Sequence, residues 1–166
     1  MFLCTAACGF VGDSGDASEE VHPAVAEKRA RQLSSGLLDM TALRGKALGG
    51  GPGISAGEES QDYSVQHFWS ISGAPPDELT QGFERLREDL PGAGWRITRY
   101  GRANSQAGQM EIEALHEKDG YSVSVELLIR STRKGRHPGA SKDDMIHFSV
   151  ASPEYRAPEG VDPDDY

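Results

Sequence analysis

The stretch that decides the fold is MEIEALHEKDGYSVSVELLI, residues 110–129. Apolar and polar side chains alternate along 110–116 and again along 121–129, and this period of two indicates two β-strands. Asp119-Gly120 lies between them and predicts a tight hairpin turn, because glycine readily adopts the positive φ that such a turn needs. The alternation assigns one set of side chains to a single inward face: Met110, Ile112, Ala114, Tyr121, Val123, Val125, Leu127 and Ile129.

The opposite face of this hairpin is polar, and it decides the number of layers. Its outward side chains are Glu111, Glu113, Ser122, Ser124 and Glu126. Burying such a face would cost free energy, so we expect only the apolar face to be covered. The hairpin therefore predicts a two-layer domain.

Two amphipathic helices are predicted upstream of the hairpin. One spans residues 77–90, where apolar side chains recur at i, i+4, i+7 and i+11. The other spans residues 23–44 and begins at Pro23, a residue that suits a first helical turn. The two apolar stripes consist of Leu79, Phe83, Leu86 and Leu90, and of Ala26, Ala30, Leu33, Leu37 and Met40.

Three further strands are predicted at residues 63–71, 95–100 and 145–151. In the last of these, Ile146, Phe148 and Val150 fall on the inward side. The order α-β-α-β-β-β-β is typical of the α+β class. We therefore expect a two-layer α+β fold, with an antiparallel β-sheet of four to five strands backed on one face by two helices.

Composition divides the 166 residues into one folded domain and two polar ends. We expect the end of a signal sequence with a flexible tether at 1–22, a single α+β domain at 23–153 and an acidic disordered tail at 154–166. Within the domain the expected parts are the helix at 23–44, a glycine-rich linker at 45–60 and the core at 61–153.

The leader contains Thr5-Ala6-Ala7-Cys8-Gly9, a pattern similar to the lipobox of bacterial lipoproteins. Small side chains let an extended backbone enter a peptidase cleft, and the thiol accepts the diacylglycerol. We expect lipidation at Cys8, which would hold the protein outside the cytoplasm on the cell membrane. The alternative is an ordinary polar N-terminus with two incidental cysteines.

Charge and hydropathy argue against two classes of function. The formal net charge of −9 disfavours nucleic-acid binding, which needs a basic face. No apolar run approaches the ~20 residues that span a bilayer. The candidate partner-binding residues form one basic loop that could dock an unknown envelope protein or an anionic surface, unless it is merely a solvated hairpin loop. They are Arg130, Arg133, Lys134 and Arg136.

No motif lies in the structural context that a catalytic site needs. His67 and His116 are predicted to face inward and His147 outward, and no carboxylate pattern brings an acid to them. Two serines match catalytic motifs by letter: Ser55 in the Gly-x-Ser-x-Gly run at 53–57 and Ser131 in the Ser-x-x-Lys run at 131–134. Both lie in segments predicted to be linker or loop, without the strand-turn-helix context that a nucleophile elbow needs. The glycine-rich run at 49–53 lacks the strand and the Lys-Ser/Thr pair of a phosphate-binding loop. We therefore expect no catalytic residue, no metal and no cofactor.

Three short motifs carry a resemblance to a known group of proteins. They are Gly94-Trp95-Arg96-Ile97-Thr98 after an amphipathic helix, DGYSVSV at 119–125 and FSVASP at 148–153. Together with the lipid-anchored leader, the chain resembles uncharacterised small actinobacterial lipoproteins of unknown function over residues 23–153. The resemblance implies an envelope location and a fold, and it implies no activity.

Two functional hypotheses remain. The leading one is a non-enzymatic, surface-tethered interaction module of the cell envelope. The alternative is a carrier of a small apolar ligand bound between helix and sheet. A carrier needs a cavity of ~300 Å³ or more, whereas the large aromatic side chains are expected to fill the small core without one. These are Trp69, Phe83, Trp95 and Phe148.

Overall fold

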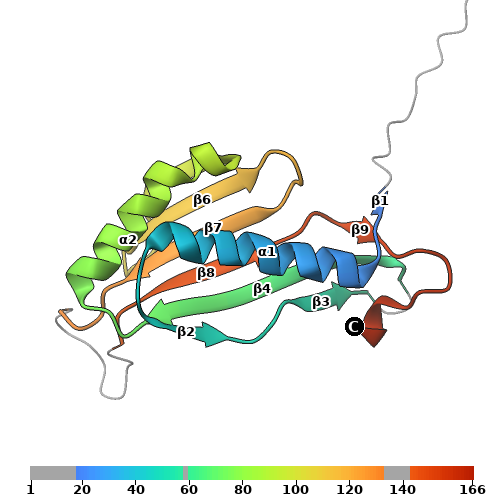
Figure 1. The fold of residues 1–166 in the computed structure, drawn as a ribbon, viewed down its shortest axis with the longest axis horizontal. Helices are drawn as coiled ribbons and strands as arrows, with labels where there is room; N and C mark the ends of the chain where they lie inside the picture. The colour runs from blue at the N-terminus through green and yellow to red at the C-terminus, as the bar shows by residue number, and fades with distance from the viewer. Residues whose placement is uncertain (1–17, 58–59, 133–142) are drawn as a thin grey trace, which may run out of the picture.

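The computed structural model describes residues 18–57, 60–132 and 143–166. These residues form one mixed β-sheet of nine strands, and two α-helices cross the same face of it (Figure 1). The α+β class is therefore as expected. The expected antiparallel sheet of four to five strands is wrong, because short strands, including one parallel pair, extend it beyond the elements that side-chain patterns predict.

The predicted hairpin lies in one half of the sheet. Strands β6 (Met110–His116) and β7 (Ser122–Leu128) pair in antiparallel register, with Ile112 opposite Val125. Strand β8 (Met145–Ala151) pairs with β7, and β5 (Trp95–Arg102) pairs with β6 at the edge. The inward side chains of β7 and β8 are buried as the alternation predicts.

Strand β4 (Asp62–Ser72) links this half to the added strands. One edge of β4 pairs with β8 along seven residue pairs, from Gln66 to Ser72. The other edge pairs with β2 (Lys46–Gly49) and β3 (Gly53–Ala56), which lie in the expected linker. Each of these strands is only four residues long and lies beside the glycine-rich run at 49–53, which is typical of a loop. Composition therefore missed both strands.

The C-terminal segment is also part of the sheet, in contrast to the expected disordered tail. Strand β9 (Tyr155–Arg156) pairs antiparallel with β4 and parallel with β1 (Glu19–Glu20). Tyr155 and Ala157 are buried in the core. The short 3-10 helix η2 (Pro163–Asp165) contacts β3. A few apolar contacts and main-chain hydrogen bonds thus order a segment whose composition is acidic.

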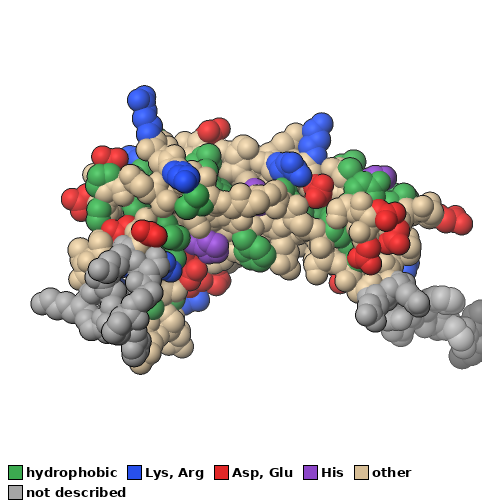
Figure 2. All heavy atoms as spheres, turned by 90° about the horizontal axis from the view of Figure 1, so that it is seen from below, with side chains coloured by type: hydrophobic (Ala, Val, Ile, Leu, Met, Phe, Trp, Pro, Cys, Tyr) green, Lys and Arg blue, Asp and Glu red, His purple; other side chains and the backbone are tan. Residues whose placement is uncertain are grey.

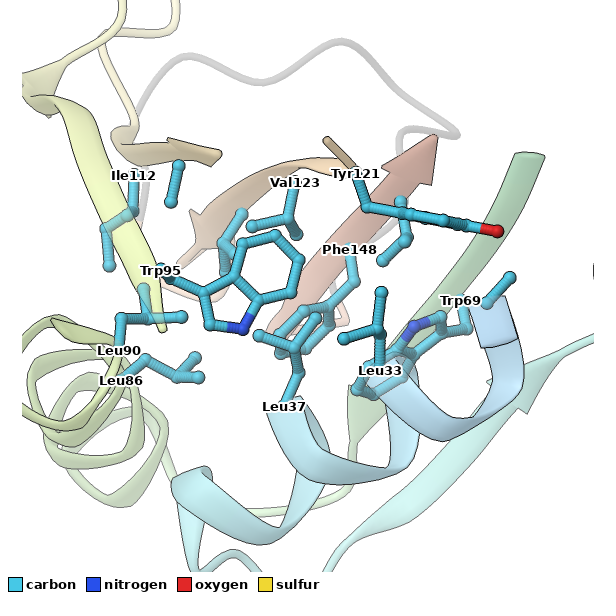
Figure 3. Close-up of a cluster of buried hydrophobic side chains, with 14 of the residues drawn as sticks. Leu33, Leu37, Trp69, Leu86, Leu90, Trp95, Ile112, Tyr121, Val123 and Phe148 are labelled. Atoms are coloured by element: carbon cyan, nitrogen blue, oxygen red, sulfur yellow. The ribbon is translucent and has the colours of Figure 1, made fainter. Parts of the chain in front are cut away.

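The two helices close the core from one side. Helix α1 (Pro23–Thr41) ends three residues earlier than predicted, and Ala42 after it has a φ of 52°. Helix α2 (Pro76–Asp89) buries the predicted stripe that includes Phe83, which is fully buried. In Figure 3, Leu33 and Leu37 of α1 project toward Trp69 and Phe148. The predicted helical stripes therefore supply the side of the core that faces the sheet.

Candidate functional site

A cleft of about 370 Å³ opens between α1, β4 and the segment that joins β2 to β3. We call residues 49–52 of that segment the glycine arch and the cavity the arch cleft. In Figure 2, which looks onto the β2–β3 edge, acidic side chains gather mainly toward the two ends of the described surface. The cleft is lined by Arg31, Ser34, Ser35, Leu38, Ala47, Leu48, Gly49, Gly50, Gly51, Pro52, His67 and Trp69.

The glycine arch begins close against β4 because Gly49 lacks a side chain. Gly49 has a φ of +148°, and a Cβ there would lie 2.8 Å from the carbonyl oxygen of Phe68. A Cβ at Gly51 would lie 3.3 Å from Nη2 of Arg31. A larger residue at either position would meet backbone or the guanidinium group. Three glycines in a row therefore let the chain turn between two short strands beside α1.

His67 connects the three elements around the cleft. Its Nε2 lies 3.1 Å from the carbonyl oxygen of Gly50, and its Nδ1 lies 2.7 Å from Oγ of Ser34. A carbonyl oxygen can only accept, so Nε2 carries the proton in the neutral ring. Nδ1 then accepts the hydrogen bond that the Ser34 hydroxyl donates. This network assigns the tautomer and ties the arch to α1 through β4.

The surroundings of His67 favour its neutral form. Burial lowers the pKa of His67, the hydrogen bond to Gly50 acts in the opposite direction, and the positive charge of Arg31 lowers the pKa further. The imidazole is therefore poised to be uncharged at neutral pH and to take up a proton only at acidic pH.

Trp69 supplies an apolar wall of the cleft. Its ring stacks on Phe148 with centroids 3.8 Å apart and planes 3° from parallel. Trp69 is almost completely buried, and its Nε1 has no hydrogen-bond partner among the described residues. Stacking against the core holds the indole rigidly, so the wall that it offers is preformed.

The Ser34–His67 pair has the spacing of a nucleophile and its base, yet its setting favours binding over catalysis. Ser34 lies inside α1 and is only 5% exposed. Amide groups in the middle of a helix are bonded within it, so the turn of Ser34 offers no oxyanion donor. Within the described residues, no group of three or more His, Cys, Asp or Glu side chains could hold a metal ion.

Of the residues predicted for partner binding, the structure describes only Arg130, which does not line the arch cleft. Cys8, Arg133, Lys134 and Arg136 lie outside the described residues. Arg130 is half-buried, and its amide donates a 2.6 Å hydrogen bond to Oδ1 of Asp144. The backbone of Arg130 therefore helps to hold the ends of the basic loop together.

The other two histidines that the sequence singles out lie apart from the cleft. His116 is buried, and its Nδ1 lies 3.3 Å from Oδ2 of Asp119, which also binds Arg29. The expectation that no acid reaches a histidine is therefore wrong, because the hairpin turn folds Asp119 back over His116. His147 lies on the outward face, 3.0 Å from Oγ of Ser70.

Sequence reasoning missed most of the cleft, although one signal was present. Arg31, Ser34 and Leu38 follow the spacing i, i+3, i+7 beside the apolar stripe of α1, so they share one side of the helix. Nothing local in the sequence indicates that the glycine arch lies against it, because the contact depends on how β2 and β3 pair with β4.

No protein-family model, no curated protein and no solved structure matches this chain. Neither helix of the described part is long and apolar enough to cross a membrane.

Proposed function

We propose that this protein is a non-enzymatic, surface-tethered binding protein that carries a small ligand in the arch cleft. The observation that supports this function is the cleft itself, whose volume of about 370 Å³ falls within the ~300–1,000 Å³ typical of small-molecule sites. This proposal favours the carrier hypothesis over a general interaction module. The ligand would lie between α1 and the glycine arch, at the edge of the sheet.

The lining of the cleft suits recognition of a small molecule. Trp69 and Leu38 offer apolar surface, while Arg31, Ser34 and His67 bring polar groups to the same space. A mostly apolar wall with a few converging polar groups is what orients a ligand in known sites. Because the hydrogen bonds of His67 hold Ser34 and Gly50 in place, the walls need little rearrangement to accept a ligand.

The binding experiment uses the neutral fluorescent probe N-phenyl-1-naphthylamine. We expect saturable binding with enhanced emission, and we expect it to be lost in Ser35→Phe. Ser35 lies on the exposed side of α1 and lines the cleft, so a phenyl ring there would fill the space without entering the core.

Thr80→Phe is the matched control. Thr80 is exposed on α2, and its hydroxyl bonds the carbonyl four residues back, as that of Ser35 does. It lies outside the cleft, so this variant should bind the probe as the wild type does. Equal binding by both variants would place the probe elsewhere and remove the support for a carrier.

The tether remains part of the proposal through the lipobox-like sequence at Cys8. When the chain is expressed behind a complete signal sequence, we expect it to incorporate labelled palmitate and to fractionate with membranes. Cys8→Ala should abolish both, whereas Cys4→Ala should incorporate the label as before. Labelling that survives Cys8→Ala would contradict a lipid anchor at this position.

A further inference from the structure

We propose that the ligand of the arch cleft is a small amphipathic anion and that its binding is linked to proton uptake by His67. This inference rests on the proposed function and names the chemical class of the ligand. The apolar part would lie against Trp69 and Leu38, and the anionic group would lie beside Arg31.

The fixed charge of the cleft favours an anion. Arg31 lines the cleft, and among the described residues no Asp or Glu lines it. Within the part of the chain that the structure describes, Arg31 has one ion pair, 3.8 Å to Glu27, and its side chain is 59% exposed. Exposed ion pairs at this spacing contribute little. The guanidinium group is therefore available to a ligand carboxylate, sulfonate or phosphate.

The hydrogen bonds of His67 provide the link to protonation. In the neutral ring the Ser34 hydroxyl donates its hydrogen to Nδ1, so this hydrogen cannot bond a ligand. A proton taken up from water at Nδ1 reverses this bond, and Nδ1–H then donates to Oγ of Ser34. The hydroxyl hydrogen is released for a ligand acceptor, while Nε2–H still donates to Gly50. One proton is gained as the new Nδ1–H bond of the imidazolium, and no other covalent bond of the protein changes.

The groups around His67 allow a bound anion to favour the protonated form of the imidazole. From α1 it faces Arg31, with Glu27 behind that residue. The arch presents the carbonyl of Gly50, and β8 presents Val150, which does not titrate. Burial and Arg31 lower the pKa of His67 in the free protein. An anion beside the imidazolium would offset both effects, so anion and proton would bind together.

The test compares two probes of nearly equal shape, naphthalene-2-sulfonate and the uncharged naphthalene-2-sulfonamide. Calorimetric titrations between pH 8 and pH 5 should show sulfonate affinity rising about tenfold, the change that a shift of one pKa unit produces. Sulfonamide affinity should stay constant. Titrations in buffers of different ionisation enthalpy should show proton uptake with the sulfonate alone.

Variants test separately how Arg31 and protonated His67 contribute to sulfonate binding. His67→Gln should remove the pH dependence of sulfonate binding, and Ser34→Ala should weaken sulfonate at pH 5 but not at pH 8. Arg31→Gln should weaken sulfonate at every pH. Arg96→Gln is the matched control, because Arg96 is 57% exposed with an ion pair of 3.5 Å and lies on β5. Sulfonamide binding by each variant reports that the cleft is intact.

The outcomes distinguish this inference from the function on which it rests. Sulfonate binding no tighter than sulfonamide binding at pH 5 would overturn the anion inference and leave the carrier function standing. A pH dependence that persists in His67→Gln, or a Ser34→Ala variant as tight as wild type at pH 5, would overturn the proton link. Failure of the neutral N-phenyl-1-naphthylamine to bind would instead remove the carrier function itself.

Discussion

Tyr121 on the β6–β7 hairpin donates a 2.9 Å hydrogen bond from its hydroxyl to the carbonyl oxygen of Ala26 in the first turn of α1. The bond joins residues 95 positions apart and is buried. Tyr63 on β4 makes a similar bond of 2.7 Å to the carbonyl of Val21, just before α1. Two tyrosine hydroxyls therefore hold the start of α1 on the sheet, at the opposite end of the helix from α2.

Removal of the Tyr121 hydroxyl should measure this attachment. Tyr121→Phe keeps the ring in the core and leaves the carbonyl of Ala26 without this donor, so we expect a loss of about 1–2 kcal/mol in the free energy of unfolding. Urea denaturation gives the value. The control is Tyr100→Phe, because Tyr100 is exposed and bonds only to Glu84 through its hydroxyl. If the two variants lose the same stability, the buried bond adds nothing.

The stability of the protein should fall at alkaline pH. Burial raises the pKa of Tyr63 to about 12, with Tyr155 adding to the rise, and burial also raises that of Tyr121. In the unfolded chain these hydroxyls ionise near pH 10. The folded state then holds more protons than the unfolded state, so stability is complete below pH 10 and is lost as pH rises from 10 toward 12.

Thermal unfolding at pH 8, 10 and 11 checks the alkaline prediction. Tyr63→Phe has no hydroxyl to ionise at that position, so its melting temperature should fall less between pH 8 and pH 11 than that of the wild type. An identical decline in both proteins would show that Tyr63 does not contribute. Absorbance of tyrosinate recorded alongside unfolding shows whether ionisation accompanies the transition.

Phe83 should be central to the core. It is fully buried on α2, and truncation of a buried aromatic side chain costs ~3–5 kcal/mol. A small domain has a total stability of only ~5 kcal/mol or slightly more, so Phe83→Ala should be largely unfolded by circular dichroism. Gln81→Ala, an exposed position on the same helix, should melt with the wild type. A folded Phe83→Ala within a few degrees of wild type would contradict the two-layer core.

The C-terminal segment should contribute to stability through Tyr155. This side chain is 6% exposed and packs near Tyr63 and Tyr121. We expect Tyr155→Ala to lose ~3 kcal/mol or more of unfolding free energy. Tyr166→Ala, at a half-exposed tyrosine of the same segment, should change it by less than ~0.5 kcal/mol. Equal losses of unfolding free energy in the two variants would indicate that the segment is a solvated tail, as its composition suggests.

The pairing of β4 with β2, β3 and β9 shows why the number of strands could not be predicted from side-chain patterns. The long strands were predictable because alternation and the Asp119-Gly120 turn are local features. The short strands add main-chain hydrogen bonds to β4, with β2 and β3 on one edge and β9 on the other, and their sequences are rich in glycine or charge. A pairing of this kind depends on an edge that exists only after the rest of the sheet has formed.

The candidate site divides in the same way. The sequence alone determined that His67 faces inward, since it alternates with Val65 and Trp69 along one strand. It also determined that no apolar run is long enough to span a bilayer as a helix. Only the tertiary structure placed Ser34, 33 residues before His67, and Gly50, 17 residues before it, at the two nitrogens of one imidazole. Side-chain period is set within a strand, whereas a cleft is set by which strands pair and which helix lies across them.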